Sequence, residues 1–116
     1  MLSDETKKNL LKLLLGVITA LSNKELQERI WINGEGPDFT ETMCTFFDDA
    51  NVDYILENYK EFGLTDEQYR ILKTFRDEFE AFSDDYYEAF EFIDTPEWDK
   101  ITKKATEVLK AFNYEK

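Results

Sequence analysis

Apolar residues recur every three or four positions along most of the chain, a spacing that is typical of amphipathic helices. The first and broadest stripe lies within residues 3–22 and comprises Leu10, Leu11, Leu14, Leu15, Val17, Ile18 and Leu21. A stripe this broad is usually covered by neighbours on two sides, so we expect this helix to be central. Runs of β-branched residues are nearly absent, and the chain has only four Gly and two Pro. The pattern therefore predicts an all-α fold.

Cap signals indicate where the helices begin, because Ser, Thr, Asn and Asp accept hydrogen bonds from the free N–H groups of a first helical turn. We expect caps at Ser3, Asp38, Asn51, Thr65 and Thr95. Gln68 follows Thr65 at the spacing of a capping box, and Glu41 follows Asp38 at the same spacing. Gly63 is expected to end the helix that begins after Asn51. The signals predict five or six helices in one compact, bundle-like domain covering residues 1–116.

Two segments are ambiguous in sequence. Residues 23–32 fit either a short helix begun at Asn23 or an extended stretch over residues 29–32, before a turn at residues 33–37 that contains two Gly and a Pro. The long helix after Thr65 either continues past Ser83 or breaks there, because Ser and Asp favour caps over helix interiors.

The apolar stretch of residues 13–21 resembles the middle of an export signal in length. A signal peptide has a basic start and a continuous apolar run. Here Asp4 and Glu5 lie in the start, and Lys12 interrupts the run. We therefore expect a buried helix, which is also too short to span a membrane.

The chain has no His and a single Cys, which narrows the chemistry that it can perform. His is the commonest general base and metal ligand, so neither a Ser-His-Asp nor a Cys-His arrangement can form. We expect Cys44, which adjoins Met43 and lies near Phe46 and Phe47, to be a buried and unreactive thiol. A lone Cys also suits a reducing cytoplasm, where we expect the protein to act.

Two segments resemble known ligand-binding loops but lack residues that those loops require. Residues 49–53 match the start of a calcium-binding EF-hand loop, but Tyr54 replaces the required Gly and Lys60 replaces the bidentate Glu. Residues 34–37 lack the Lys and the third Gly of a phosphate-binding loop. We expect no catalytic residue, no metal and no cofactor, so the protein is expected not to be an enzyme.

The net charge of −12 is concentrated in the middle of the chain. Residues 1–30 hold four acids and five bases, residues 31–99 hold twenty acids and four bases, and residues 100–116 hold two acids and five bases. Such a distribution either serves solubility through a solvated face or presents a negative surface to a basic partner. Nucleic acid and anionic membranes would be repelled, so we expect neither as a partner.

Two clusters combine acids with neighbouring aromatic residues, as interface hot spots do. The first cluster comprises Asp84, Asp85, Tyr87, Glu88, Glu91 and Asp94. The second cluster comprises Asp48, Asp49, Asp53 and Glu57. We expect these ten residues to bind a basic protein.

Three segments resemble a known family. They are residues 29–37, the run Phe46-Phe47-Asp48-Asp49, and the C-terminal stretch from Thr95-Pro96-Glu97-Trp98 to Phe112. They look like small acidic immunity proteins of bacterial contact-dependent growth inhibition systems. The resemblance implies a cytoplasmic protein that binds and neutralises the toxic domain of a secreted toxin, often a basic nuclease. It supplies no catalytic residues and no contact residues.

Other acidic interaction proteins remain as alternatives, namely a nucleic-acid mimic or a secretion chaperone. A chaperone would need an exposed apolar groove for its client. A mimic would space its acids regularly along one face, and the sequence lacks that regularity.

Overall fold

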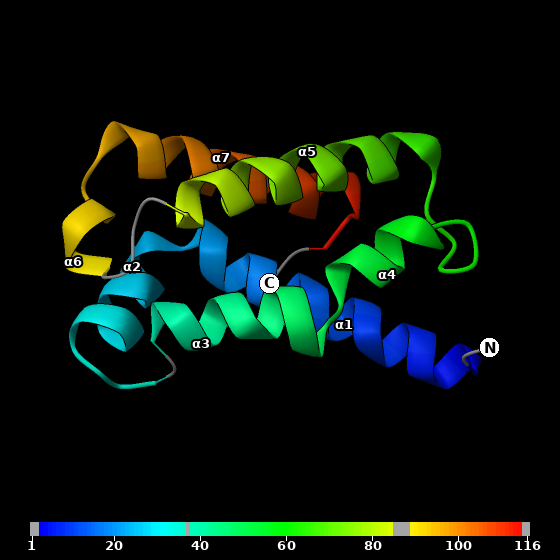
Figure 1. Ribbon diagram of the computed structural model, residues 1–116, viewed down its shortest axis with the longest axis horizontal. Coiled ribbons are helices and arrows are strands. Elements are labelled where there is room, and N and C mark those ends of the chain that lie inside the picture. Colours follow the sequence, from blue (N-terminus) through cyan, green and yellow to red (C-terminus); the bar gives the residue numbers. More distant parts are fainter. Residues whose placement is uncertain (1–2, 37, 85–88, 115–116) are drawn as a thin grey trace.

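The computed structural model describes residues 3–36, 38–84 and 89–114, and every regular element in these ranges is helical (Figure 1). Five α-helices have six residues or more: α1 (Asp4–Ser22), α3 (Phe39–Cys44), α4 (Val52–Glu57), α5 (Asp66–Ser83) and α7 (Pro96–Ala111). Two shorter ones are α2 (Lys24–Gln27) and α6 (Ala89–Phe92). Two π-helical turns, η1 (Glu28–Ile32) and η2 (Thr45–Asp49), continue α2 and α3 directly. The prediction of an all-α, bundle-like fold is confirmed.

Four helical segments form the body of the bundle, namely α1, α3 with η2, α5 and α7. Helix α7 packs against both α1 and α5, and η2, which continues α3, packs against α1. Figure 1 shows α5 and α7 along one side, α1 and α3 along the other, and α2 and α6 at one end. Each of the four contributes a fully buried side chain to the core, and examples are Ile18, Phe46, Phe79 and Trp98.

The buried side-chain amide of Gln27 links three helices at the end of the bundle where α2 lies. The Trp98 Nε1–H group donates to Oε1 of Gln27 at 2.8 Å, and Gln27 Nε2 donates to the Ala20 carbonyl oxygen at 2.9 Å. Both Gln27 and Trp98 are completely buried. Because a buried polar group is costly without partners, this pair fixes α2 between the end of α1 and the start of α7.

The five expected caps are present. Thr65 Oγ1 accepts from the Gln68 N–H while the Gln68 side chain accepts from the Thr65 N–H, which completes the capping box. The Asp38 side chain accepts from the Glu41 N–H at 2.8 Å. The side chains of Ser3, Asn51 and Thr95 likewise accept from the N–H group three residues further on. The backbone of Ser3 and Thr95 is extended, whereas Asn51 has a positive φ of 52°.

The structure decides between the alternatives for the two segments that are ambiguous in sequence. Residues 24–32 are helical rather than extended, with Asn23 as the cap. Helix α5 ends at Ser83, and Asp84 occupies its C-terminal cap.

The expected end of the helix after Asn51 was wrong. Helix α4 stops at Glu57, because the backbone of Asn58 leaves the helical region at φ −122° and ψ 33°. The Asn58 side chain donates to the Tyr54 carbonyl oxygen at 3.0 Å and so caps this end. A run of turns follows in which each N–H donates to the carbonyl oxygen three residues earlier, and Gly63 closes it with a positive φ of 77°. Gly63 therefore ends the turns rather than the helix.

Candidate functional site

Residues 38–57 form an acidic part of the described surface. They contain six acids and no base. The four residues of the second predicted cluster, Asp48, Asp49, Asp53 and Glu57, are all exposed. Because η2 packs against α4, the structure brings these four residues onto neighbouring elements.

Asp53 differs from the other three residues of this cluster because it is paired with Arg76 on α5. Its Nε donates to Asp53 Oδ1 at 2.8 Å and its Nη2 to Asp53 Oδ2 at 3.3 Å, which is a bidentate pair. The same guanidinium lies 3.1 Å from Asp77 and 2.7 Å from Glu80. Its central carbon lies 5.7 Å from the centre of the Phe47 ring. Asp53 is therefore held within an intramolecular ion-pair network.

The ion pairs of Arg76 and Asp77 shift the pKa values of these two residues. Desolvation opposes the charge of Arg76, but hydrogen bonds with Asp53 and Asp77 outweigh it and raise the pKa of the guanidinium. The pKa of Asp77 lies below its ordinary value, first because Lys73 donates a hydrogen bond to it at 3.1 Å and then because Arg76 does. The acids around Arg76 are thus partly neutralised within the chain.

Four other acids of residues 38–57 remain available to a partner. Glu41, Asp48, Asp49 and Glu57 are exposed, and none forms an ion pair with another residue in the described part of the chain. We call these four residues the acidic strip. Unpaired surface carboxylates are the groups that steer a basic partner during association.

The first predicted cluster is only partly described. Asp85, Tyr87 and Glu88 lie outside the described residues. Asp84 and Glu91 are exposed. Asp94 lies 2.9 Å from Lys24 on α2, and this hydrogen bond raises the pKa of the lysine. The negative charge of Asp94 is thus partly balanced by the chain itself.

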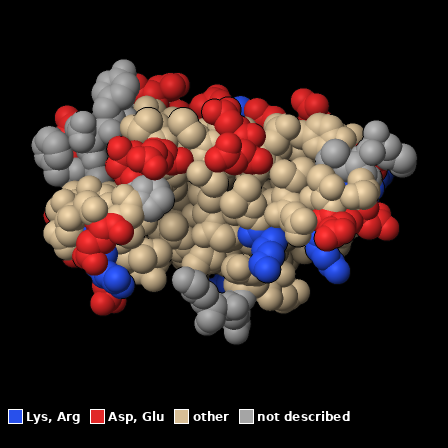
Figure 2. Space-filling model, turned by 90° about the horizontal axis from the view of Figure 1, so that it is seen from below, with Lys and Arg blue, Asp and Glu red and all other residues tan. Residues whose placement is uncertain are grey.

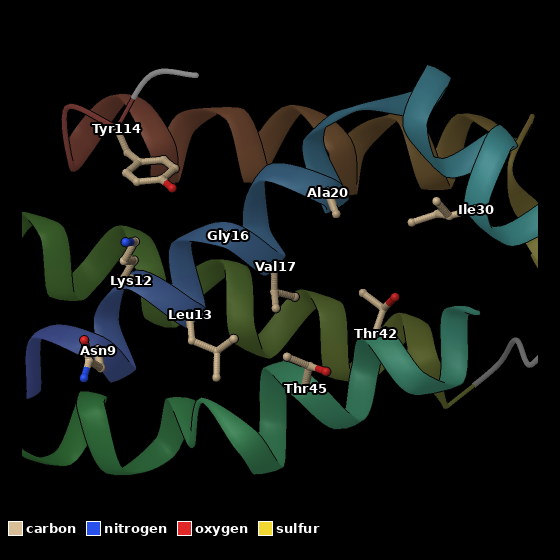
Figure 3. Close-up of a pocket in the computed structure, with 10 residues that line it drawn as sticks. All are labelled: Asn9, Lys12, Leu13, Gly16, Val17, Ala20, Ile30, Thr42, Thr45 and Tyr114. Atoms are coloured by element: carbon tan, nitrogen blue, oxygen red, sulfur yellow. The ribbon is translucent and has the colours of Figure 1, made fainter. Parts of the chain in front are cut away.

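A groove between α1 and α3 is the feature that the sequence reasoning missed. Its volume is about 560 Å³, within the range of roughly 300 to 1,000 Å³ that ligand sites occupy. In Figure 3, Leu13, Val17 and Ala20 of α1 point towards α3, and Thr42 and Thr45 point back towards α1. Residues from the two π-helical turns, Ile30 and Thr45, contribute to the lining. π-Helical turns are rare and are frequent at functional sites.

The groove is apolar inside and charged at its borders. Figure 2 shows an uncharged central surface, with acidic side chains along the upper side and basic side chains below it towards the right. Lys12 is one of the lining residues, and it forms no ion pair within the described part of the chain. Leu13 is 41% exposed, although it lies within the most apolar stretch of the sequence. We call this feature the α1–α3 groove.

Cys44 lies on the outer side of α3, and the expectation that it would be buried was wrong. The buried side of α3 is formed by Phe39 and Thr42. Thr42 faces inward because its hydroxyl accepts from Trp31 Nε1 at 3.2 Å and donates to the Asp38 carbonyl oxygen at 2.9 Å. Cys44 lies two residues further along the helix, on roughly the opposite side from Thr42, and its thiol therefore faces solvent.

Neither a metal site nor a membrane-spanning element is found in the residues that the structure covers. No group of three or more His, Cys, Asp and Glu residues in those ranges could hold a metal ion. No helix there is long and apolar enough to cross a bilayer. The surfaces that stand out are therefore the acidic strip and the α1–α3 groove.

No family model, no curated protein and no solved structure matches this chain. The functional argument accordingly depends on the geometry and the charge of these two surfaces.

Proposed function

We propose that this chain is a toxin-neutralising immunity protein that acts in the bacterial cytoplasm and blocks a basic toxin domain, such as a nuclease. The acidic strip carries the proposal, because Glu41, Asp48, Asp49 and Glu57 offer four unpaired carboxylates on consecutive elements. The resemblance to small acidic immunity proteins supports the same function.

The chemistry of a nuclease explains why such a strip would inhibit it. An enzyme that cleaves nucleic acid holds phosphates with Lys and Arg side chains. Carboxylates that bind those cations compete with the substrate and accelerate association. Complexes between nuclease toxins and their inhibitors are among the tightest known.

Co-expression tests the proposal. The toxic partner would be the C-terminal domain of a secreted protein whose gene directly precedes this one. We expect growth to be rescued by the chain, and to be lost when Glu41, Asp48, Asp49 and Glu57 are changed together to Gln or Asn. Equal killing with and without the chain would refute the proposal.

A matched control separates the position of the charge from its amount. Glu5, Glu67, Glu97 and Glu107 are also exposed acids, and they lie on α1, α5 and α7. Changing these four to Gln removes the same formal charge from other surfaces. Rescue should survive in the control, and equal loss in both variants would mean that only net charge matters.

The α1–α3 groove favours a second candidate, a secretion chaperone, because such a protein needs an exposed apolar surface. A chaperone would bind a segment of its client without blocking the client's activity. Measuring the activity of the purified client in the presence of this chain distinguishes the two functions.

A further inference from the structure

Gly16 has no role in the fold that explains its presence in the middle of α1. It lies in the 19-residue helix with an ordinary negative φ, and a Cβ atom added to it would meet nothing within 4 Å. A Gly inside a helix costs about 1 kcal/mol relative to Ala. Gly16 lines the α1–α3 groove, so its missing side chain leaves room there for something that approaches the helix backbone.

The groove has the length that a short helix requires. Along α1 its lining runs from Asn9 to Ala20, which is about 16 Å at 1.5 Å per residue. A bound helix anchored at i, i+4 and i+7 spreads these side chains over about 10 Å. The groove is also open to solvent rather than enclosed. This shape suits an elongated element better than a small molecule, which is usually enclosed.

The two borders of the groove have opposite charge. On α3 and η2, Glu41 lies four residues before Thr45 and Asp49 four residues after it, so these acids follow the border that Thr45 forms. On α1, Lys8 lies four residues before Lys12 on the opposite border. An occupant would therefore carry basic residues on the flank that faces α3.

We propose that the α1–α3 groove binds one amphipathic helix of a basic protein. Its apolar side chains would lie between the α1 side of the groove, at Leu13 and Val17, and the opposite side, at Thr42 of α3 and Thr45 of η2. Its Lys or Arg residues would face Glu41 and Asp49. The choice of a basic protein rests on the proposed function. A second copy of this chain is the weaker occupant, because two molecules of net charge −12 repel each other.

Synthetic helices of about 16 residues test the groove without the partner. The first peptide carries three leucines at i, i+4 and i+7 and arginines along one flank. The second replaces the arginines by glutamates, and the third keeps them but replaces the leucines by serines. In fluorescence anisotropy, we expect the second and third to bind at least about tenfold more weakly than the first. Equal binding of the first and third peptides would overturn the inference, because it would reflect charge alone.

Filling the groove provides the matching test on the protein. Gly16→Leu places a side chain in the lining without removing any helical residue, and we expect at least about tenfold weaker binding of the first peptide. Thr74→Leu adds the same side chain at an exposed position of α5 and should leave binding unchanged. Undiminished binding by Gly16→Leu would overturn the inference.

The two large apolar residues that are exposed in the described part form a second matched pair. Leu13 lines the groove and is 41% exposed, whereas Ile32 is 45% exposed and does not line it. Leu13→Ser should weaken peptide binding and Ile32→Ser should not. Equal losses would place the peptide elsewhere and refute the inference.

Co-expression with the toxic domain separates this inference from the proposed function. If the unaltered chain rescues growth and Gly16→Leu rescues it equally well, the groove inference fails and the immunity function stands. If the unaltered chain gives no rescue but the first peptide still binds in a Gly16-dependent manner, the immunity function fails and the groove stands as a helix-binding site.

Discussion

The two sides of α1 both carry apolar side chains, but they differ in burial. On the buried side, Leu14, Ile18 and Leu21 are completely inaccessible to solvent. On the groove side, Leu13 is 41% exposed and Gly16 is exposed as well. The buried side is required by the fold, since α1 packs extensively against α7. On the groove side, Leu13 stays exposed although η2 packs against α1, and this exposure is better explained by binding than by folding.

The largest effect should follow from a cavity on the buried side. Ile18→Ala removes a fully buried side chain, and we expect it to lower the free energy of unfolding by about 2 to 5 kcal/mol. Urea unfolding followed by circular dichroism measures this loss. A change below about 1 kcal/mol would show that the two sides of α1 do not differ as described.

A smaller loss is expected at Gln27 of α2, which hydrogen-bonds to the end of α1. Gln27→Leu leaves Trp98 Nε1 without its hydrogen-bond partner and removes one of the two donors to the Ala20 carbonyl oxygen. Leaving a buried polar group unpaired costs about 1 to 3 kcal/mol. Thermal unfolding of this variant beside Glu25→Leu, a change at an exposed position of α2, measures the contribution of the amide. Equal stability of the two variants would mean that the amide contributes nothing specific.

On the groove side, the expected change has the opposite sign. Gly16→Ala should raise the free energy of unfolding by about 0.5 to 1 kcal/mol, because Ala favours the helix and its Cβ has open space. Urea unfolding provides the measurement. If Gly16→Ala instead destabilises the chain, Gly16 has a structural role and the contrast between the two sides of α1 is weakened.

The smallest effect concerns charge and pH, on α5 outside the groove. Because the folded-state pKa of Asp77 is lowered, its ion pairs contribute stability above the unfolded pKa of about 4 and lose that contribution as the pH falls through the lower folded value. The unaltered chain should therefore lose slightly more stability than Asp77→Asn between pH 5 and pH 3. Unfolding curves at a series of pH values test this difference, and parallel losses would contradict it.

Most of the fold could be predicted from the sequence because its signals are local. The caps at Thr65 and Thr95 depend on side chains within three residues of the helix start, and the stripes of α5 and α7 follow helical spacing. The end of α4 was less predictable. Gly commonly ends a helix, but the non-helical backbone of Asn58, whose side chain caps the Tyr54 carbonyl oxygen, ends α4 before Gly63.

The candidate site was less accessible to sequence reasoning, because it depends on contacts between distant residues. The acids at residues 48–57 are visible in the sequence, but the Arg76 network that occupies Asp53 joins residues 23 positions apart. The α1–α3 groove likewise depends on how α1 packs against η2. The sequence contains one signal for it. Lys12, Gly16 and Ala20 recur every four residues, so they lie on one side of a helix whose other side is strongly apolar.

The exposure of Cys44 has a practical consequence for spectroscopy. It is the only thiol in the sequence and lies one residue before Thr45. A maleimide dye or a nitroxide would therefore attach at one position, beside the groove, without any substitution. Its emission or line shape would report in real time whether the groove is filled.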